Sequence, residues 1–232
     1  MKRIIALIFG FCVCMLGVQA QEQPYPPYSE LDGKVVVSEF HSLDNVDEEA
    51  IFLNALIYVV ENGNRPEEGA LEVDFEKKQF AIELFSTNPK TENRYNYTLS
   101  VKVSEHIITM LTSDIVNVAS SSVIKFVKKL PFERLQPEKK PKHKDYLEEF
   151  AKLYKSNIEQ ILTFITTNKL PSITHWNEIK ESNVVKGMNE IECLLSMGKP
   201  ISRKDQGDKS EWMYDTYTYL FFENGILISF IK

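Results

Sequence analysis

Hydrophobic positions follow two different periods along the chain, and together they predict both strands and helices. Residues 34–40 are rich in β-branched side chains and predict a strand. Residues 47–61 carry apolar side chains at helical spacing and end at Asn62-Gly63, which predicts an amphipathic helix. Four apolar runs with short polar connections follow, at residues 71–75, 79–86, 95–103 and 106–118. Connections this short favour an antiparallel meander.

A long helix is predicted after the meander. Residues 120–130 fit either a helix or a strand, and residues 136–144 form a polar connection broken by proline. From about residue 145 to 168, apolar side chains make a broad stripe along one side of a helix. Because this stripe would cover one face of the meander, residues 31–168 predict a β-α-β-β-β-β-α domain.

A second domain is predicted for residues 171–232, because Pro171 disfavours helix at the residue before it. Residues 172–181 predict a short helix, and Asn189 followed by Glu192 predicts the capping box of a second one. The fold class is therefore α+β. It has two domains, and in each an antiparallel sheet is covered on one face by helices.

The strands of this second domain are predicted at residues 210–215, 217–223 and 226–231. Asn224-Gly225 joins the last two, and both residues of this pair readily adopt the positive φ that a tight hairpin turn needs. The domain therefore reads as α-α-β-β-β.

Residues 1–20 have the order of a secretory signal. Lys2 and Arg3 give a positive start, residues 4–18 are apolar, and small side chains precede a cleavage site between Ala20 and Gln21. The apolar run is shorter than the ~20 residues of a membrane-spanning helix. Lipid attachment at Cys12 or Cys14 is the alternative, but bulky residues stand where a lipoprotein signal has Gly or Ala. Residues 21–30 contain three prolines and read as an extended leader.

The charge of the chain restricts its partners. Cleavage removes two basic residues and no acidic one, so the net charge changes from −6 to −8. A negative protein is poorly suited to nucleic acid or anionic membranes. We therefore expect a soluble protein of the periplasm or extracellular space with no transmembrane segment. Its partner is expected to be another envelope protein, and its oligomeric state is left open.

The residues that usually carry catalysis are scattered. None of the four histidines shares a metal-binding spacing with another: His41, His106, His143 and His175. Cys193, the single cysteine of the mature chain, falls on an apolar helix position and reads as a core residue. The chain has no Gly-x-Ser-x-Gly elbow and no phosphate-binding glycine loop. We expect no catalytic site, metal or cofactor.

Aromatic and turn residues of the second domain are the candidates for binding. Trp212 and a tyrosine two residues later face the same way along a strand, so both are expected in the core. The candidate interaction surface consists of Trp176, Tyr217, Asn224 and Gly225. The basic residues between positions 125 and 144 fit either a solvated linker or a contact with an acidic partner.

Residues 184–200, 211–214 and 219–225 resemble the BamE (SmpA/OmlA) family and its β-lactamase-inhibitor-like fold. The shared features are a Gly-Met turn before a helix, Gly-x-Pro after it, a Trp-x-Tyr strand and a closing Asn-Gly hairpin. The resemblance implies an envelope protein that contacts other proteins. BamE itself is a lipoprotein of the outer-membrane assembly machinery, whereas the signal here has no lipobox.

Residues 31–168 look like the TBP-like-fold domain of unknown function found in exported Bacteroidota proteins, on the order of elements and the aromatic strand at residues 95–103. The name of that fold does not imply DNA binding, since a fold does not determine function. Three hypotheses remain. The first is a non-enzymatic protein-binding or scaffold module. The second is a small-molecule or glycan binder that uses an inter-domain cleft, and the third is a hydrolase of unrecognised type.

Export can be tested by mass. When the gene is expressed in its own cell, the intact protein is expected to begin at Gln21 and to carry no lipid. Intact-mass measurement of the envelope fraction checks this. A protein that retains Met1 in the cytosol would contradict the expectation.

Overall fold

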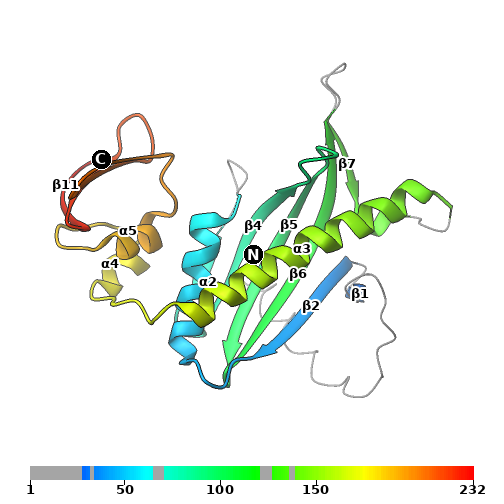
Figure 1. Ribbon diagram of the computed structural model, residues 1–232, viewed down its shortest axis with the longest axis horizontal. Coiled ribbons are helices and arrows are strands. Elements are labelled where there is room, and N and C mark those ends of the chain that lie inside the picture. Colours follow the sequence, from blue (N-terminus) through cyan, green and yellow to red (C-terminus); the bar gives the residue numbers. More distant parts are fainter. Residues whose placement is uncertain (1–27, 32–33, 65–70, 121–126, 136–138) are drawn as a thin grey trace.

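The computed structural model describes residues 28–31, 34–64, 71–120, 127–135 and 139–232 (Figure 1). It has the α+β class expected from the sequence, with two antiparallel sheets. The first sheet has the order β1-β2-β6-β5-β4-β3, and β7 also pairs with β6. Its strands are β1 (Tyr28–Leu31), β2 (Lys34–Ser42), β3 (Leu71–Asp74), β4 (Gln79–Thr87), β5 (Arg94–Ser104), β6 (Ile107–Ser120) and β7 (Val127–Pro131).

The predicted meander is confirmed in β3 to β6, in which each strand pairs antiparallel with the next. β5 and β6 join through Glu105 and His106, both at positive φ, in a two-residue hairpin that pairs Ser104 with Ile107. Along β5 the side chains of Tyr95, Tyr97 and other alternate residues are buried. Side chains at alternate positions therefore supply one apolar face of the sheet.

Helices α2 (Glu48–Asn62) and α3 (Pro141–Thr167) cover this face of the first sheet (Figure 1). Asp47 caps α2, because its side chain accepts hydrogen bonds from the backbone N–H groups of Glu49 and Ala50. The sequence predicted an amphipathic α2, but ten of its fifteen residues are buried. A helix that is apolar almost all round needs neighbours on several sides, and α2 has the sheet, α3 and a helix of the second unit.

An aromatic cluster centred on Phe150 holds α3 against the sheet. The Phe150 ring lies 5.4–5.6 Å, centroid to centroid, from the rings of Tyr95, Tyr97 and Phe132, and 6.0 Å from that of Tyr154. Most of these contacts are tilted or edge-to-face, the arrangements that aromatic pairs prefer. Phe150 has no solvent-exposed surface. Phe132 belongs to η1 (Phe132–Arg134), a short 3-10 helix.

The second unit has two helices and four strands. They are α4 (Trp176–Lys180), α5 (Glu190–Met197), β8 (Ser202–Gln206), β9 (Lys209–Met213), β10 (Tyr219–Glu223) and β11 (Ile226–Ile231), with the sheet order β11-β10-β9-β8. The predicted capping box is present, because Asn189 accepts from the Glu192 N–H while the Glu192 side chain accepts from the Asn189 N–H. Asn224 and Gly225 form the predicted hairpin turn, with φ of 52° and 74°.

The two units share a continuous core. Helix α5 packs against α2, and the Trp176 ring lies 5.4 Å from that of Phe75. One connected cluster of buried apolar side chains includes residues of both units. Figure 1 shows α2 between the first sheet and α5.

Three strands and one helix start depart from the expected pattern. β1 and β7 add to the first sheet, and β8 adds a polar edge to the second. Helix α3 begins at Pro141, earlier than expected, because proline at the first helical turn needs no hydrogen-bond donor there. Within the described ranges, no helix has both the length and the apolar character needed to cross a membrane.

Truncating Phe150 tests the importance of the aromatic cluster. Phe150→Ala is expected to lower the free energy of unfolding by about 3–5 kcal/mol, because it leaves a cavity among four rings. Lys155→Ala, an exposed position on the same helix, should change it by less than about 0.5 kcal/mol. Urea denaturation followed by circular dichroism measures both. Equal stabilities of the two variants would contradict this role for Phe150.

Candidate functional site

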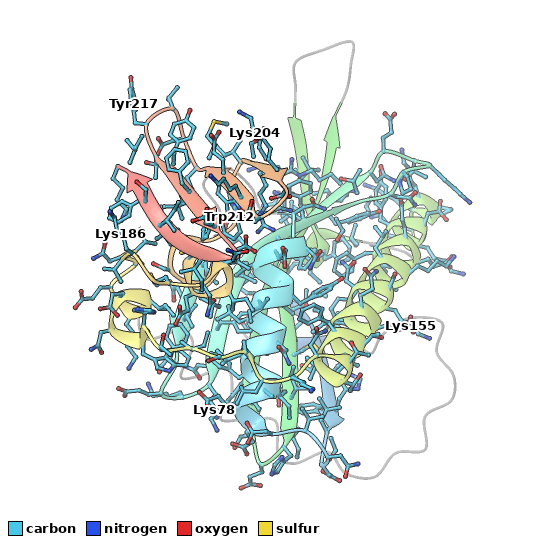
Figure 2. All side chains as sticks on the ribbon, turned by 60° about the vertical axis from the view of Figure 1, so that its left-hand side comes forward. Lys78, Lys155, Lys186, Lys204, Trp212 and Tyr217 are labelled. Carbon is cyan, nitrogen blue, oxygen red and sulfur yellow. The ribbon has the colours of Figure 1, made fainter. Side chains whose placement is uncertain are left out.

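The structure distributes the four candidate surface residues over separate places. Trp176 begins α4 and is half-buried against Phe75, at the contact between the two units. Tyr217 is 78% exposed in the connection between β9 and β10. Asn224 and Gly225 lie at the other end of β10. Figure 2 shows Tyr217 projecting from the second sheet, while the buried Trp212 lies within the unit.

The Asn224-Gly225 turn is tied to its neighbours through the backbone. The Asn224 N–H donates to the Asp208 carbonyl at 2.7 Å, and the Glu190 N–H donates to the Gly225 carbonyl at 3.2 Å. These bonds connect the last hairpin with the β8–β9 turn and with the start of α5. Binding of a partner by these residues stays a prediction. In the structure, their backbone bonds join the last hairpin to the β8–β9 turn and to α5.

The inner face of the second sheet belongs to the core. Trp212 and Phe222 are buried, with ring centroids 4.7 Å apart, and Cys193 on α5 is buried with them. Burial raises the pKa of the Cys193 thiol to about 12, so it stays protonated and unreactive. This position confirms the expected core role of Cys193.

The two edges of the second sheet differ in character. Along β8, residues 203–206 (RKDQ) are exposed and mostly charged. Arg203 pairs with Glu61 of α2 at 2.7 Å and lies over the Trp212 ring. Charges of this kind protect an edge strand from pairing with other chains.

At the opposite edge, β11 exposes isoleucine instead. Ile226, Ile228 and Ile231 are 42%, 44% and 54% exposed. Residues 187–189 bond to the start of this edge, since the Leu227 N–H donates to the Met188 carbonyl and the Leu227 carbonyl accepts from the Gly187 N–H. Just after β11, the Lys232 side chain donates to Asn183 Oδ1 at 3.3 Å. Among the described residues, no strand lies beside β11 on this side. The sequence analysis did not identify this edge as a candidate site. The signal was the strand alternation, which places Ile226 and Ile228 on the side opposite to the buried Leu227.

Glu192 is a buried carboxylate that ties the start of the second unit together. Its side chain is 1% exposed and accepts hydrogen bonds from the N–H groups of Thr174, His175 and Asn189 at 2.5, 3.0 and 2.8 Å. The Thr174 hydroxyl donates to it as well, and His175 Nδ1 lies 3.0 Å away. Burial raises the Glu192 pKa, but these bonds outweigh it and lower the pKa to about 2. So many donors to one carboxylate indicate a structural role.

A cavity of about 360 Å³ lies between α2, α3 and strands β4 and β5. Its lining includes no charged side chain: Tyr58, Val59, Asn62, Gly63, Asn64, Leu84, Phe85, Ser86, Tyr97, Leu99, Tyr154, Asn157, Ile158, Gln160 and Ile161. Gly63 leaves room at the end of α2, because a Cβ there would lie 2.4 Å from the Val59 carbonyl oxygen. The sequence signal for this cavity was Asn157, a polar residue within the apolar stripe of α3.

The polar groups of the cavity form a connected set. Asn157 Nδ2 donates to Ser86 Oγ at 3.0 Å and to the Tyr97 hydroxyl at 3.2 Å. The Ser86 and Tyr97 hydroxyls are also 3.2 Å apart. Burial raises the pKa of Tyr97 and of Tyr154, so both hydroxyls stay neutral. The cavity therefore offers donors and acceptors without net charge.

The four histidines lie apart in the structure too. His41 contacts Glu39, His106 contacts the Val46 carbonyl, and His143 stacks on Tyr146. Across the part of the chain that the structure describes, no three His, Cys, Asp or Glu side chains are grouped to hold a metal ion.

Comparisons with known proteins concern the fold alone. No protein-family model and no curated protein matches this chain. A solved structure of a TBP-like protein from Parabacteroides distasonis ATCC 8503 is 15% identical and covers 61% of this chain and 99% of its own, with a TM-score of 0.47. A DUF4468 family protein from Bacteroides ovatus ATCC 8483 is also 15% identical and covers 67% of this chain and 100% of its own, with a TM-score of 0.46. Neither description names a ligand or reaction, and the BamE resemblance stays a prediction.

Acid titration tests the role of Glu192. Its folded pKa lies below its ordinary value of 4.5, so the unfolded chain binds this proton more tightly. The stability it contributes is complete above about pH 4.5, and about 3 kcal/mol is lost as the pH falls toward 2. Glu192→Gln should be destabilised by about 2–3 kcal/mol at neutral pH and should lose less on acidification.

The matched control is Glu181→Gln, an exposed acidic residue of the same unit, which should keep the acid dependence of the parent chain. Chemical denaturation at a series of pH values between neutral and 2 measures both variants. If Glu192→Gln and the parent lost the same stability on acidification, the assignment would be wrong.

Proposed function

We propose that this chain is a non-enzymatic, exported protein-binding module whose β11 edge accepts an extended strand of another envelope protein. The observation that carries the proposal is the asymmetry of the second sheet. Its β8 edge carries charged side chains, which disfavour pairing with another chain, whereas its β11 edge exposes isoleucines. Exposed apolar edges are sites at which another chain can pair.

The chemistry of an open edge fits an extended partner. A strand that adds to a sheet gains main-chain hydrogen bonds, and alternate side chains supply specificity. The register of β10 with β11 shifts at Phe221-Phe222, so Ile228 has no partner on β10. The open stretch thus comprises residues 228–231, between the bonds from residues 187–189 and the contact of Lys232 with Asn183.

The partner strand should be apolar on the side that meets Ile228 and Ile231. Nearby, the rings of Tyr219 and Phe221 stack with their centroids 6.4 Å apart and are half-buried on the outer face of the sheet. Aromatic side chains of this kind are enriched at protein interfaces. Edge and outer face together favour a partner that lies along β11 and extends over β10.

Site-specific photo-crosslinking in the producing cell tests the proposal. A photoreactive residue at Ile228 or Ile231 is expected to capture one partner, while the same residue at Ile201 should capture none. Ile201 is the matched control because it is 72% exposed and lies next to the other edge strand, β8. Mass spectrometry of the crosslinked peptide identifies the partner segment.

Purified partner then gives the quantitative comparison. Ile228→Lys should weaken binding at least about tenfold, a loss of about 1.4 kcal/mol, and Ile201→Lys should leave it unchanged. Crosslinking that is equal at residues 201 and 228, or equal affinities of the two lysine variants, would refute the assignment of this edge.

A further inference from the structure

We propose that the cavity between α2 and α3 binds a neutral, hydroxyl-rich small molecule of monosaccharide size. All residues that line this site belong to the first unit, and none belongs to the β11 edge. It is independent of the protein-binding proposal, and either can fail without the other. In Figure 1, α2 and α3 lie on the near face of the first sheet. The cavity is lined by residues of these helices and of β4 and β5.

The size and lining of the cavity define the class of ligand. A volume of about 360 Å³ lies at the small end of the usual range for ligand pockets, about 300–1,000 Å³. The apolar part of its wall comes from leucine, isoleucine, valine and aromatic side chains, and the polar part from amides and hydroxyls. A sugar presents the same combination, with apolar C–H faces and hydroxyl groups around its edge.

The absence of charged groups among the lining residues selects against ionic ligands. An ion that entered the cavity would give up water and meet only dipoles, which is unfavourable for a buried charge. Amide and hydroxyl groups can both donate and accept, as sugar hydroxyls do. Asn157 uses its Nδ2 for Ser86 and Tyr97, and its Oδ1 accepts no hydrogen bond from the described residues. This oxygen is available to a ligand hydroxyl.

Tyr154 forms part of the cavity wall, but its hydroxyl lies away from the cavity. The hydroxyl is inaccessible to solvent and has the buried Thr112 hydroxyl of β6, which does not line the cavity, as its hydrogen-bonding neighbour. Tyr154 therefore offers a ligand the side of its ring, and the hydrogen bonds must come from Asn157, Ser86 and Tyr97.

The rim of the cavity can adjust to a ligand. The Tyr58 hydroxyl donates to Gln160 Oε1 at 2.8 Å, which links α2 to α3 above the cavity. Asn62 and Gln160 are exposed, so their side chains can reorient at little cost. Buried groups would thus fix one side of the ligand, and rim groups would close over the other.

Calorimetric titration of the intact chain tests the proposal with glucose, galactose and N-acetylglucosamine as neutral probes. Glucuronate and glucosamine serve as the charged comparison. At least one neutral sugar is expected to bind saturably with a Kd of about 1 mM or tighter. The charged compounds should bind at least about tenfold more weakly.

A substitution at Asn157 locates the site, and a nearby exposed position on the same helix is its control. Asn157→Leu should weaken binding at least about tenfold, and Lys155→Leu, two residues away, should not change it. Figure 2 shows Lys155 pointing outward from α3.

Circular dichroism confirms that each variant is folded before titration. The proposal is overturned if none of the three neutral sugars binds with a Kd of about 1 mM or tighter. It is also overturned if glucuronate and glucosamine bind as tightly as the neutral sugars. It is also overturned if Asn157→Leu keeps the parent affinity, since binding would then lie elsewhere.

Discussion

The burial of α2 is the constraint on which the rest of the structure depends. Ten of its fifteen residues are buried, so no single neighbouring surface can cover it. On one side, Phe80 of the first sheet and Phe75 of the turn between β3 and β4 pack against Phe52 of α2. Helix α3 covers a second side of α2, through the contact of Phe164 with Tyr58, and α5 covers a third side. The cavity and the position of the second unit both follow from how these neighbours are arranged around one helix.

Features set by local chemistry were predicted well from the sequence. Asn224-Gly225 forms its hairpin because both residues tolerate positive φ, and Asn189 with Glu192 closes a capping box within four residues. The antiparallel meander followed from short connections. Strand β8 was missed because its polar sequence carries no apolar alternation, and it is held by pairing with β9. The start of α3 was missed because Pro141 was interpreted as a break, although proline is favoured in a first helical turn.

The candidate site was harder to predict, because exposure depends on residues far away in the sequence. Trp176 is half-buried by Phe75, which lies about a hundred positions earlier in the chain. The sequence around Trp176 does not predict that contact. The cavity combines residues of α2, β4, β5 and α3, so it exists only in the folded chain. What the sequence did offer was Asn157 and Tyr154 on one side of α3. A polar amide within an apolar stripe indicates a buried hydrogen-bonding site, even when its location is unknown.

The position of α2 also bears on how the chain can be divided. The change of pattern at Leu170-Pro171 marks the point where the chain passes from one unit to the next, but the apolar cluster continues across it. A fragment that ended at Asn168 would leave the α5-facing side of α2 open to water, and a fragment beginning at Pro171 would lose the surface on which α5 rests. Neither piece is therefore suited to separate expression. The chain should unfold in a single cooperative step, as one body with two sheets.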